Sequence, residues 1–162
     1  MRKNKGFSLV ELIIVIAIMA ILVGIMVPVM LHFIEKSNVS SDYQLADTIR
    51  SAVAYSIVDA RVKEDPDSQP YLEELENPTT GLNINGKDMV NITTIGDSVL
   101  KESLEEYTGS TLDSLKNQIR SAHDSDTECY VCTTNGVVQI TLYHTDNTGK
   151  KNTDAGRDIT VQ

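Results

Sequence analysis

The sequence predicts an α+β protein in which one long N-terminal helix packs against a C-terminal antiparallel sheet. Apolar residues form a dense N-terminal run, then recur at spacings of three and four, and finally alternate in short β-rich segments. Hydrophobic residues make up 41% of the 162 residues, and 23 of them lie among the 28 residues from Phe7 to Ile34. We therefore expect a membrane anchor joined to a lean soluble body.

The N-terminal run is long enough to cross a bilayer. A helix over Phe7 to Ile34 would measure about 42 Å, which spans the hydrocarbon core with some tilt. Three basic residues precede the run, and they predict that the N-terminus stays on the cytoplasmic side of a single-pass anchor. No small-residue cut site of the secretory type follows the run, so we expect it to remain part of the protein.

Glu11, Gly24 and Pro28 are among the five residues that interrupt the apolar pattern of the anchor. The Glu11 carboxylate either lies in water at the membrane interface or awaits a cationic partner, because a buried carboxylate is costly. Pro28 cannot donate a hydrogen bond to the carbonyl of Gly24, so a kink or local opening is expected there. Membrane helices also tolerate such residues without any function.

The string Lys5-Gly6-Phe7-Ser8-Leu9-Val10-Glu11-Leu12 with the apolar run after it resembles the class III signal of type IV pilins and pseudopilins. The resemblance covers residues 5–34. It implies that a prepilin peptidase cuts between Gly6 and Phe7 and methylates the new N-terminus. It also implies that Glu11 acts in assembly and that Pro28 bends the helix.

The resemblance further implies how the chain is divided. Residues 1–6 would be a leader, 7–34 a filament-core helix, and 35–162 a globular domain. Within that domain the helix would run to about residue 62, followed by a connecting region over 63–127 and a sheet over 128–162.

The implied partners are those of a pilin. They are identical subunits in a helical filament, other pilins and minor pilins, the prepilin peptidase and a membrane assembly platform. The subunit would lie in the cytoplasmic membrane before assembly and in a cell-surface pilus afterwards. In the filament, the freed amine of Phe7 would meet the Glu11 carboxylate of a neighbour, so that each buried charge has a partner.

Beyond the anchor, the helix is expected to continue as an amphipathic helix to about Val62. Its apolar face has helical spacing and comprises Val39, Tyr43, Ala46, Ile49, Val53, Ile57 and Ala60. This face is interpreted as core. Pro66 and Pro70, among acidic residues, are predicted to end the helix and open a loop.

The connecting region contains two predicted short helices and a possible hairpin. The hairpin would turn at Asn85-Gly86. Asp97 or Ser98 can cap a helix that ends at Gly109. A capping-box-like start at residues 110–113 predicts a second helix that runs through Leu115, Ile119 and Ala122.

The last third is predicted to be an antiparallel meander. Strands are expected over residues 128–134, 137–144 and 157–161. Asn135-Gly136 forms the first turn and a polar stretch over 146–151 the second. A sheet packed on the second half of the long helix agrees with the architecture of pilins.

Cys129 and Cys132 admit three interpretations. In a regular strand they face opposite sides, which favours two separate thiols. A tight local disulfide would need a bulge or a turn. A metal or redox site with His123 or His144 lacks a second ligand pair at zinc spacing.

The function predicted from these observations is that of a structural subunit in an extracellular type IV pilus, serving adhesion, motility or surface interaction. No catalytic constellation stands out, no cofactor or metal is expected, and the protein is interpreted as a non-enzyme. From Phe7 onward 11 basic residues face 23 acidic ones, so nucleic-acid binding by the body is disfavoured.

Two alternatives remain open at this stage. One is a pseudopilin of a competence, DNA-uptake or type II-like secretion apparatus. The other is a membrane-anchored redox or metal-binding module that uses Cys129 and Cys132. The absence of a long disulfide-closed loop favours a Gram-positive, clostridia-like source.

Overall fold

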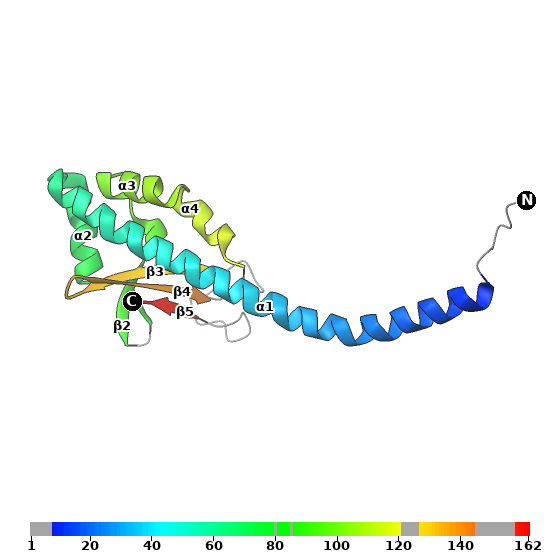
Figure 1. Cartoon of the computed structure of the whole chain (residues 1–162). Coiled ribbons are helices and arrows are strands. Elements are labelled where there is room, and N and C mark those ends of the chain that lie inside the picture. Colours follow the sequence, from blue (N-terminus) through cyan, green and yellow to red (C-terminus); the bar gives the residue numbers. More distant parts are fainter. Residues whose placement is uncertain (1–7, 80, 85, 121–126, 145–157) are drawn as a thin grey trace, which may run out of the picture. The chain divides into compact units, whose positions relative to one another are not determined.

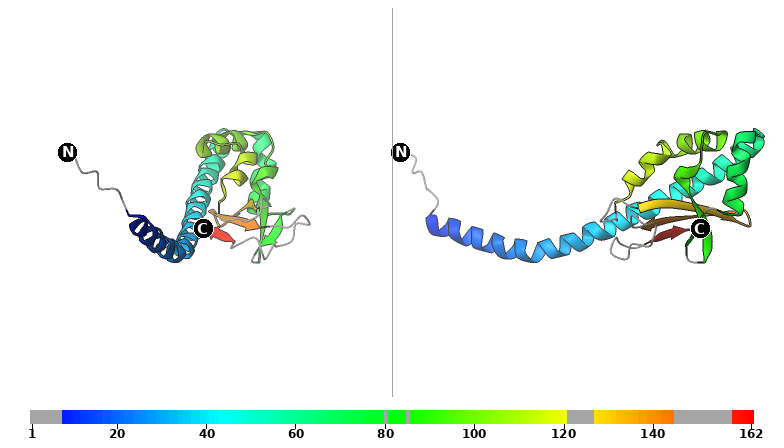
Figure 2. Two further views of the ribbon diagram at one scale, coloured as in Figure 1. Left: turned by 90° about the vertical axis from the view of Figure 1, so that its right-hand side faces the viewer. Right: turned by 180° about the vertical axis from the view of Figure 1, so that it is seen from behind.

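A computed structural model of the chain describes residues 8–79, 81–84, 86–120, 127–144 and 158–162. It contains one long helix, α1 (Leu9–Val62), followed by short helices and strands (Figures 1 and 2). The chain divides into two compact units, residues 1–37 and 38–162. The elements after α1 are η1 (Pro66–Ser68), α2 (Gln69–Glu76), β1 (Leu82–Ile84), β2 (Lys87–Asn91), η2 (Ile92–Thr94), α3 (Val99–Thr108), α4 (Leu112–Leu115), η3 (Lys116–Gln118), β3 (Thr127–Thr134), β4 (Val137–His144) and β5 (Ile159–Val161).

The α+β fold is confirmed, and the strands form one antiparallel sheet in the order β1-β2-β3-β4-β5. The turn between β3 and β4 is the predicted Asn-Gly turn, with φ values of 53° at Asn135 and 78° at Gly136. These left-handed conformations are those that a two-residue hairpin turn requires. The predicted turn over 146–151 lies outside the described residues, and β5 begins at Ile159.

The hairpin predicted around Asn85-Gly86 is also confirmed, because Ile84 pairs with Lys87. Sequence reasoning did not connect this hairpin to the C-terminal sheet, whereas the structure joins β2 to β3 through two residue pairs only. Beyond these pairs the hairpin reaches over the sheet. The Nζ atom of Lys87 donates a hydrogen bond to Oε1 of Gln139 on β4, although β3 lies between β2 and β4.

The main core lies between the second half of α1, the short helices and one face of the sheet. Four residues of the predicted stripe are buried, namely Ala46, Ile49, Val53 and Ala60. The prediction that Tyr43 belongs to this buried face is wrong, because 43% of its surface is exposed. Its neighbour Asp42 is fully buried instead. The Asp42 carboxylate accepts a hydrogen bond of 2.9 Å from the backbone N–H of Arg120, so its burial satisfies a distant polar group.

The prediction that an acidic loop follows α1 is wrong. Residues 66–76 form η1 and then α2, which buries Leu72 and Leu75. Pro66 and Pro70 each occupy the first turn of one of these helices. Proline is suited to that place, because its φ angle is helical and its missing N–H would have no partner there.

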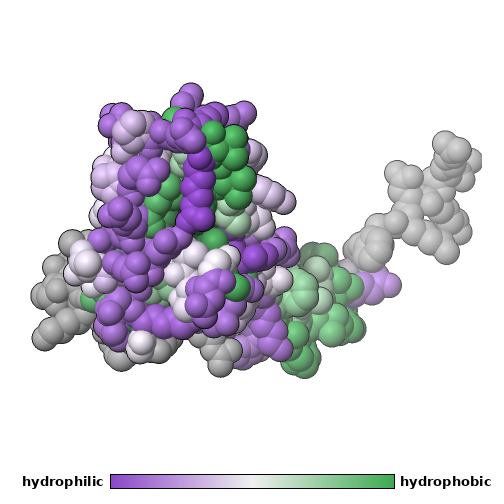
Figure 3. Space-filling model, turned by 90° about the vertical axis from the view of Figure 1, so that its left-hand side faces the viewer, coloured by the Kyte–Doolittle hydropathy of each residue, from purple (hydrophilic) through white to green (hydrophobic). Residues whose placement is uncertain are grey.

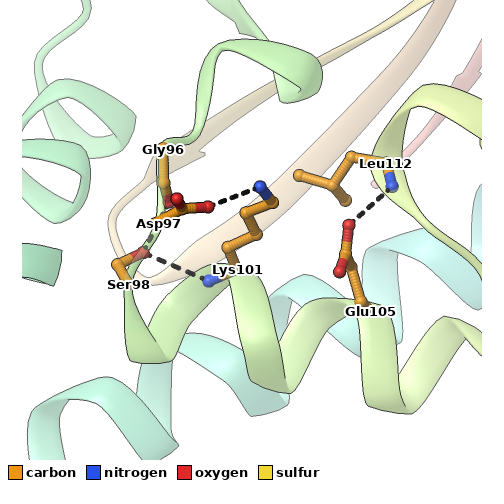
Figure 4. A network of polar contacts seen from close by, with 6 residues as sticks. All are labelled: Gly96, Asp97, Ser98, Lys101, Glu105 and Leu112. Carbon is orange, nitrogen blue, oxygen red and sulfur yellow. Dashed lines mark hydrogen bonds and ion pairs between the residues drawn. The ribbon is translucent and has the colours of Figure 1, made fainter.

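The helix α3 agrees with its prediction, and its polar contacts are drawn in Figure 4. The Ser98 hydroxyl accepts a hydrogen bond from the backbone N–H of Lys101, and Gly109 ends the helix with a φ of 65°. Lys101 also donates to the carboxylate of Asp97 at 2.8 Å. These contacts are local, which is why the sequence predicts them.

The next helix is shorter than predicted. It ends at Leu115 and is followed by η3, and Ile119 has an extended ψ of 126°. The Thr111 side chain makes no cap hydrogen bond; instead the Glu105 carboxylate accepts the N–H of Leu112 at 3.0 Å (Figure 4). Ala122 lies outside the described residues.

Asp65 joins the end of α1 to the start of α3. One of its carboxylate oxygens accepts hydrogen bonds from the Ser68 hydroxyl at 2.5 Å and from the N–H of Val99 at 3.0 Å. The Ser68 hydroxyl in turn accepts the N–H of Leu100 at 3.0 Å. Donation by the Ser68 hydroxyl and the Val99 amide holds the pKa of Asp65 below its ordinary value of 3.8.

The lowered pKa of Asp65 predicts a pH dependence of stability. Because the folded state favours the carboxylate, its contribution is complete above pH 3.8 and is lost as the pH falls through the lower, folded-state value. Asp65→Asn, which cannot ionise, should weaken this acid dependence and destabilise the body at neutral pH. Urea unfolding between pH 2 and pH 7 measures the free energy of unfolding of both proteins. If that free energy falls equally steeply with acid in parent and variant, the prediction is contradicted.

Candidate functional site

The first half of α1 presents an apolar surface that nothing in its own unit covers. The large hydrophobic side chains from Leu9 to Ile34 expose between 47% and 73% of their surface. The most apolar part of α1 has a mean hydropathy of 3.2, and among the described residues it is the one candidate for a membrane span. Figure 3 shows this segment as a block of hydrophobic residues, in contrast to the mostly polar body. A surface of this kind needs a membrane or a protein partner.

The start of α1 carries a cap that sequence reasoning missed. The Glu11 side chain accepts a hydrogen bond of 2.9 Å from the backbone N–H of Ser8. The spacing Ser8-x-x-Glu11 is that of a capping box, in which an acidic side chain satisfies a free N–H at the helix start. This spacing is a local signal that can be read from the sequence.

The other predicted residues of the anchor lie at different places along it. The helix runs without a break through Gly24 and Pro28. Apart from the adjoining residues and the nearby backbone of α1 itself, no atom lies within 4 Å of the position that a Cβ atom on Gly24 would occupy. The need for glycine here therefore does not come from packing within the chain, and a kink or opening stays a prediction. Gly6 and Phe7 lie outside the described residues.

The body exposes a second, smaller apolar surface that the sequence did not indicate. We call it the distal patch: Tyr55, Val58 and Val62 on one face of α1, with Tyr107 of α3. The rings of Tyr55 and Tyr107 lie 5.6 Å apart, and the Tyr107 hydroxyl donates to Asp59 at 3.0 Å. This hydrogen bond to a carboxylate raises the pKa of Tyr107.

Cys129 and Cys132 are both buried free thiols. Cys129 belongs to the main core under α1, whereas Cys132 belongs to a second cluster with Ile84, Met89, Tyr130 and Tyr143. The two thiols therefore lie on opposite faces of β3, and the alternative of a local disulfide is not realised. β3 pairs without a bulge from Thr127 to Thr134, so nothing turns the two side chains toward each other.

The surroundings of the two thiols differ. Burial raises the pKa of Cys129 to about 12, which keeps it a thiol at neutral pH. Burial also raises the pKa of Cys132, but the positive charge of Lys87 and a hydrogen bond from Thr134 oppose that rise. Among the described residues no cluster of histidine, cysteine or carboxylate side chains could hold a metal ion. His123 and the side chain of His144 lie outside them.

Comparison with known protein families identifies a motif in the anchor. Residues 1–27 match the prokaryotic N-terminal methylation motif. This match includes the predicted cleavage position, Glu11 and most of the apolar run. The motif and the apolar helix fit anchoring in a membrane followed by export into a pilus.

The curated relatives that the chain matches are named as fimbrial proteins. A fimbrial protein of Dichelobacter nodosus is 35% identical over 78 residues, which is 48% of each chain. A type IV major fimbrial protein FimA of the same species is 34% identical over 78 residues, again 48% of each chain. A fimbrial protein of Moraxella nonliquefaciens is 41% identical over 54 residues, 33% of this chain and 35% of the relative.

The chain therefore spans about half the length of the curated relatives that it matches. No solved structure matches it. These matches give no support to the Gram-positive, clostridia-like source expected from the sequence.

The separation of the apolar half of α1 from the folded body leads to a prediction. A fragment from Val39 to Gln162 contains the whole main core and has a net charge of −11. It should be a soluble monomer, because the distal patch is small, and it should not bind DNA, because its charge opposes counterion release.

Light scattering and a salt-dependent DNA titration test both halves of this prediction. Val58→Asp is the matched variant, since it breaks only the distal patch. If the fragment forms tight oligomers, the first half is contradicted. If Val58→Asp returns these oligomers to monomers, the distal patch drives the association. Submicromolar DNA binding at physiological salt would contradict the second half.

Proposed function

We propose that this protein is a structural subunit of a type IV pilus and that it polymerises through residues 7–62. The observation that carries the proposal is the exposed apolar half of α1, which bears the methylation motif and is joined to a separate folded, acidic body. Lateral burial of this surface at about 25 cal/mol per Å² would hold subunits together outside the membrane. The body would then form the surface of the filament.

Maturation would begin with removal of the leader. A prepilin peptidase would cut between Gly6 and Phe7 and methylate the amine of Phe7. The mature protein would then begin at Phe7. Before assembly it would be a single-pass protein of the cytoplasmic membrane with its N-terminus inside, since three basic residues precede the apolar run.

Glu11 would have two partners in succession. In the single chain its carboxylate accepts the Ser8 N–H. In the filament the positive amine of Phe7 from a neighbouring subunit would approach the same carboxylate and give each buried charge a partner. Such a pair favours correct axial register even if its net stabilisation is small.

Minor pilins and a membrane assembly platform would act with the subunit, and the chain itself would perform no catalysis on external substrates. A pseudopilin role has no specific observation in its favour, and the matched relatives are named as fimbrial proteins. N-terminal sequencing and intact mass of protein sheared from the cell surface test the proposal directly.

The cleavage position predicts the effect of changes at Gly6. A bulky residue, as in Gly6→Leu, should leave the leader attached and the protein in the membrane, because the peptidase of this family needs a small residue before the cut. Gly6→Ala is the matched control and should be processed. The measurement is the ratio of precursor to mature protein on immunoblots. Normal fibres formed by Gly6→Leu would contradict the assignment of the cleavage position.

The two roles of Glu11 predict that charge and capping can be separated. Glu11→Gln keeps an oxygen for the Ser8 N–H but loses the charge, whereas Glu11→Ala loses both. Both variants should insert into the membrane and both should lose fibres, since an unpaired buried amine costs about 3–5 kcal/mol.

Fibre yield relative to the membrane pool measures this effect. If Glu11→Gln polymerises as well as the parent while Glu11→Ala does not, capping matters and charge pairing is irrelevant. If both polymerise normally, Glu11 has no role in assembly.

A further inference from the structure

Three side chains with complementary reactivity meet on the face of the sheet that lies away from α1. The Lys87 amine donates to the Gln139 carbonyl oxygen at 2.5 Å, across 52 residues of sequence. Cys132 is the direct cross-strand partner of Gln139 in the β3–β4 ladder. Directly paired residues point to the same face of a sheet with Cβ atoms about 4.5–5.5 Å apart. An amine, a carboxamide and a thiol thus share one small volume.

This place is shielded from water on one side and open on the other. Cys132 is 2% exposed and Gln139 is 6% exposed. Cys132 packs with Ile84, Met89, Tyr130 and Tyr143, which form an apolar wall. Lys87 and Cys132, but not Gln139, line a cavity of about 410 Å³ that opens to solvent. A reactive acyl group would be protected here, and a small product could leave.

We propose that Lys87, Cys132 and Gln139 form a self-processing site that joins Lys87 to Gln139 through an amide bond, with Cys132 as the nucleophile. The substrate is the protein itself. The inference does not rest on the role of the chain in a filament, since all three groups belong to one body.

The reaction balances without any external reagent. The Cys132 sulfur attacks the side-chain carbonyl carbon of Gln139, a C–S bond forms, the C–N bond breaks, and the thiol proton leaves with the nitrogen as ammonia. Ammonia then takes a proton from the Lys87 ammonium and departs as ammonium. The neutral Lys87 amine attacks the thioester, a C–N bond forms, the C–S bond breaks, and the sulfur recovers a proton from the amine.

The geometry assists the first step in two ways. The Lys87 N–H groups point at the oxygen on which negative charge develops during the attack, which is the arrangement of an oxyanion hole. Burial raises the pKa of Cys132 overall, and the Lys87 charge reduces that rise. Cys129 has neither advantage, because it lies on the other face of β3 in the main core.

The product would tie the β1–β2 hairpin to the sheet. This hairpin is held to β3 by two residue pairs, so it is the part of the sheet with the fewest ladder contacts to the rest. An amide bond between Lys87 and Gln139 fastens its tip to β4, across β3. The sheet would then resist peeling at its β1 edge under mechanical load.

Intact mass spectrometry of the full chain in detergent, kept reduced at neutral pH, tests the inference. The parent should lose about 17 Da, the mass of the released ammonia, and digestion should yield one peptide that joins the segments around Lys87 and Gln139. Lys87→Arg keeps the positive charge but is not acylated, and Gln139→Glu keeps the shape. Both should retain the full mass. Cys132→Ser, which keeps the volume, should abolish or greatly slow the loss.

The position of the mass loss separates the proposal from its rivals. Loss of ammonia at Asn85 or Asn135, each followed by glycine, would overturn it, as would full mass in the parent after prolonged incubation. A product that hydroxylamine reverses would be a stable thioester, and it would overturn the assignment of Lys87 as acceptor. Equal rates of mass loss in the parent and in Cys132→Ser would overturn the assignment of Cys132 as the nucleophile. None of these results changes the expectations for Gly6 or Glu11.

Discussion

The structure depends on one continuous helix that meets two different environments. From Ala46 to Ala60, α1 supplies the centre of the main core, where the sheet and the short helices cover it. From Leu9 to Ile34 the same helix has no apolar partner among the described residues of its unit. Because backbone hydrogen bonds in a helix are satisfied internally, one element can pass from water to a membrane or a filament core without exposing unpaired polar groups. The body has only to cover one stripe of it.

The acidic character of the body is partly structural. Asp42 and Asp65 each accept a backbone N–H from a distant segment, at Arg120 and Val99 respectively. Glu105 accepts the N–H of Leu112 at the start of the next short helix. These carboxylates hold the connecting region between α1 and the sheet, where the helices are too short to be stable alone. Charge-assisted hydrogen bonds of this kind are stronger than neutral ones. The body thus uses negative charge both as a solvated surface and as a set of long-range caps.

The two faces of the sheet pack in different hydrophobic clusters. One face carries Cys129 and packs in the main core, while the other carries Cys132 and is covered by the β1–β2 hairpin. The second cluster is small and aromatic, with Tyr130 and Tyr143 edge to face at 6.1 Å. The hairpin therefore covers this face and brings Lys87 to Gln139.

The sequence by itself determined the elements whose causes are local. The long helix to Val62, the cap at Ser98, the end at Gly109 and both Asn-Gly hairpins follow from periodicity, capping and turn residues. The anchor and its methylation motif were also readable, and the Ser8–Glu11 cap could have been found from its spacing. Tertiary structure alone decided that Asp42 is buried in place of Tyr43, that the helix after Thr111 stops at Leu115, and that the hairpin covers Cys132. For Asp42 and Cys132 the deciding partner is distant in sequence, and no local pattern records which distant group will satisfy a hydrogen bond or cover a surface.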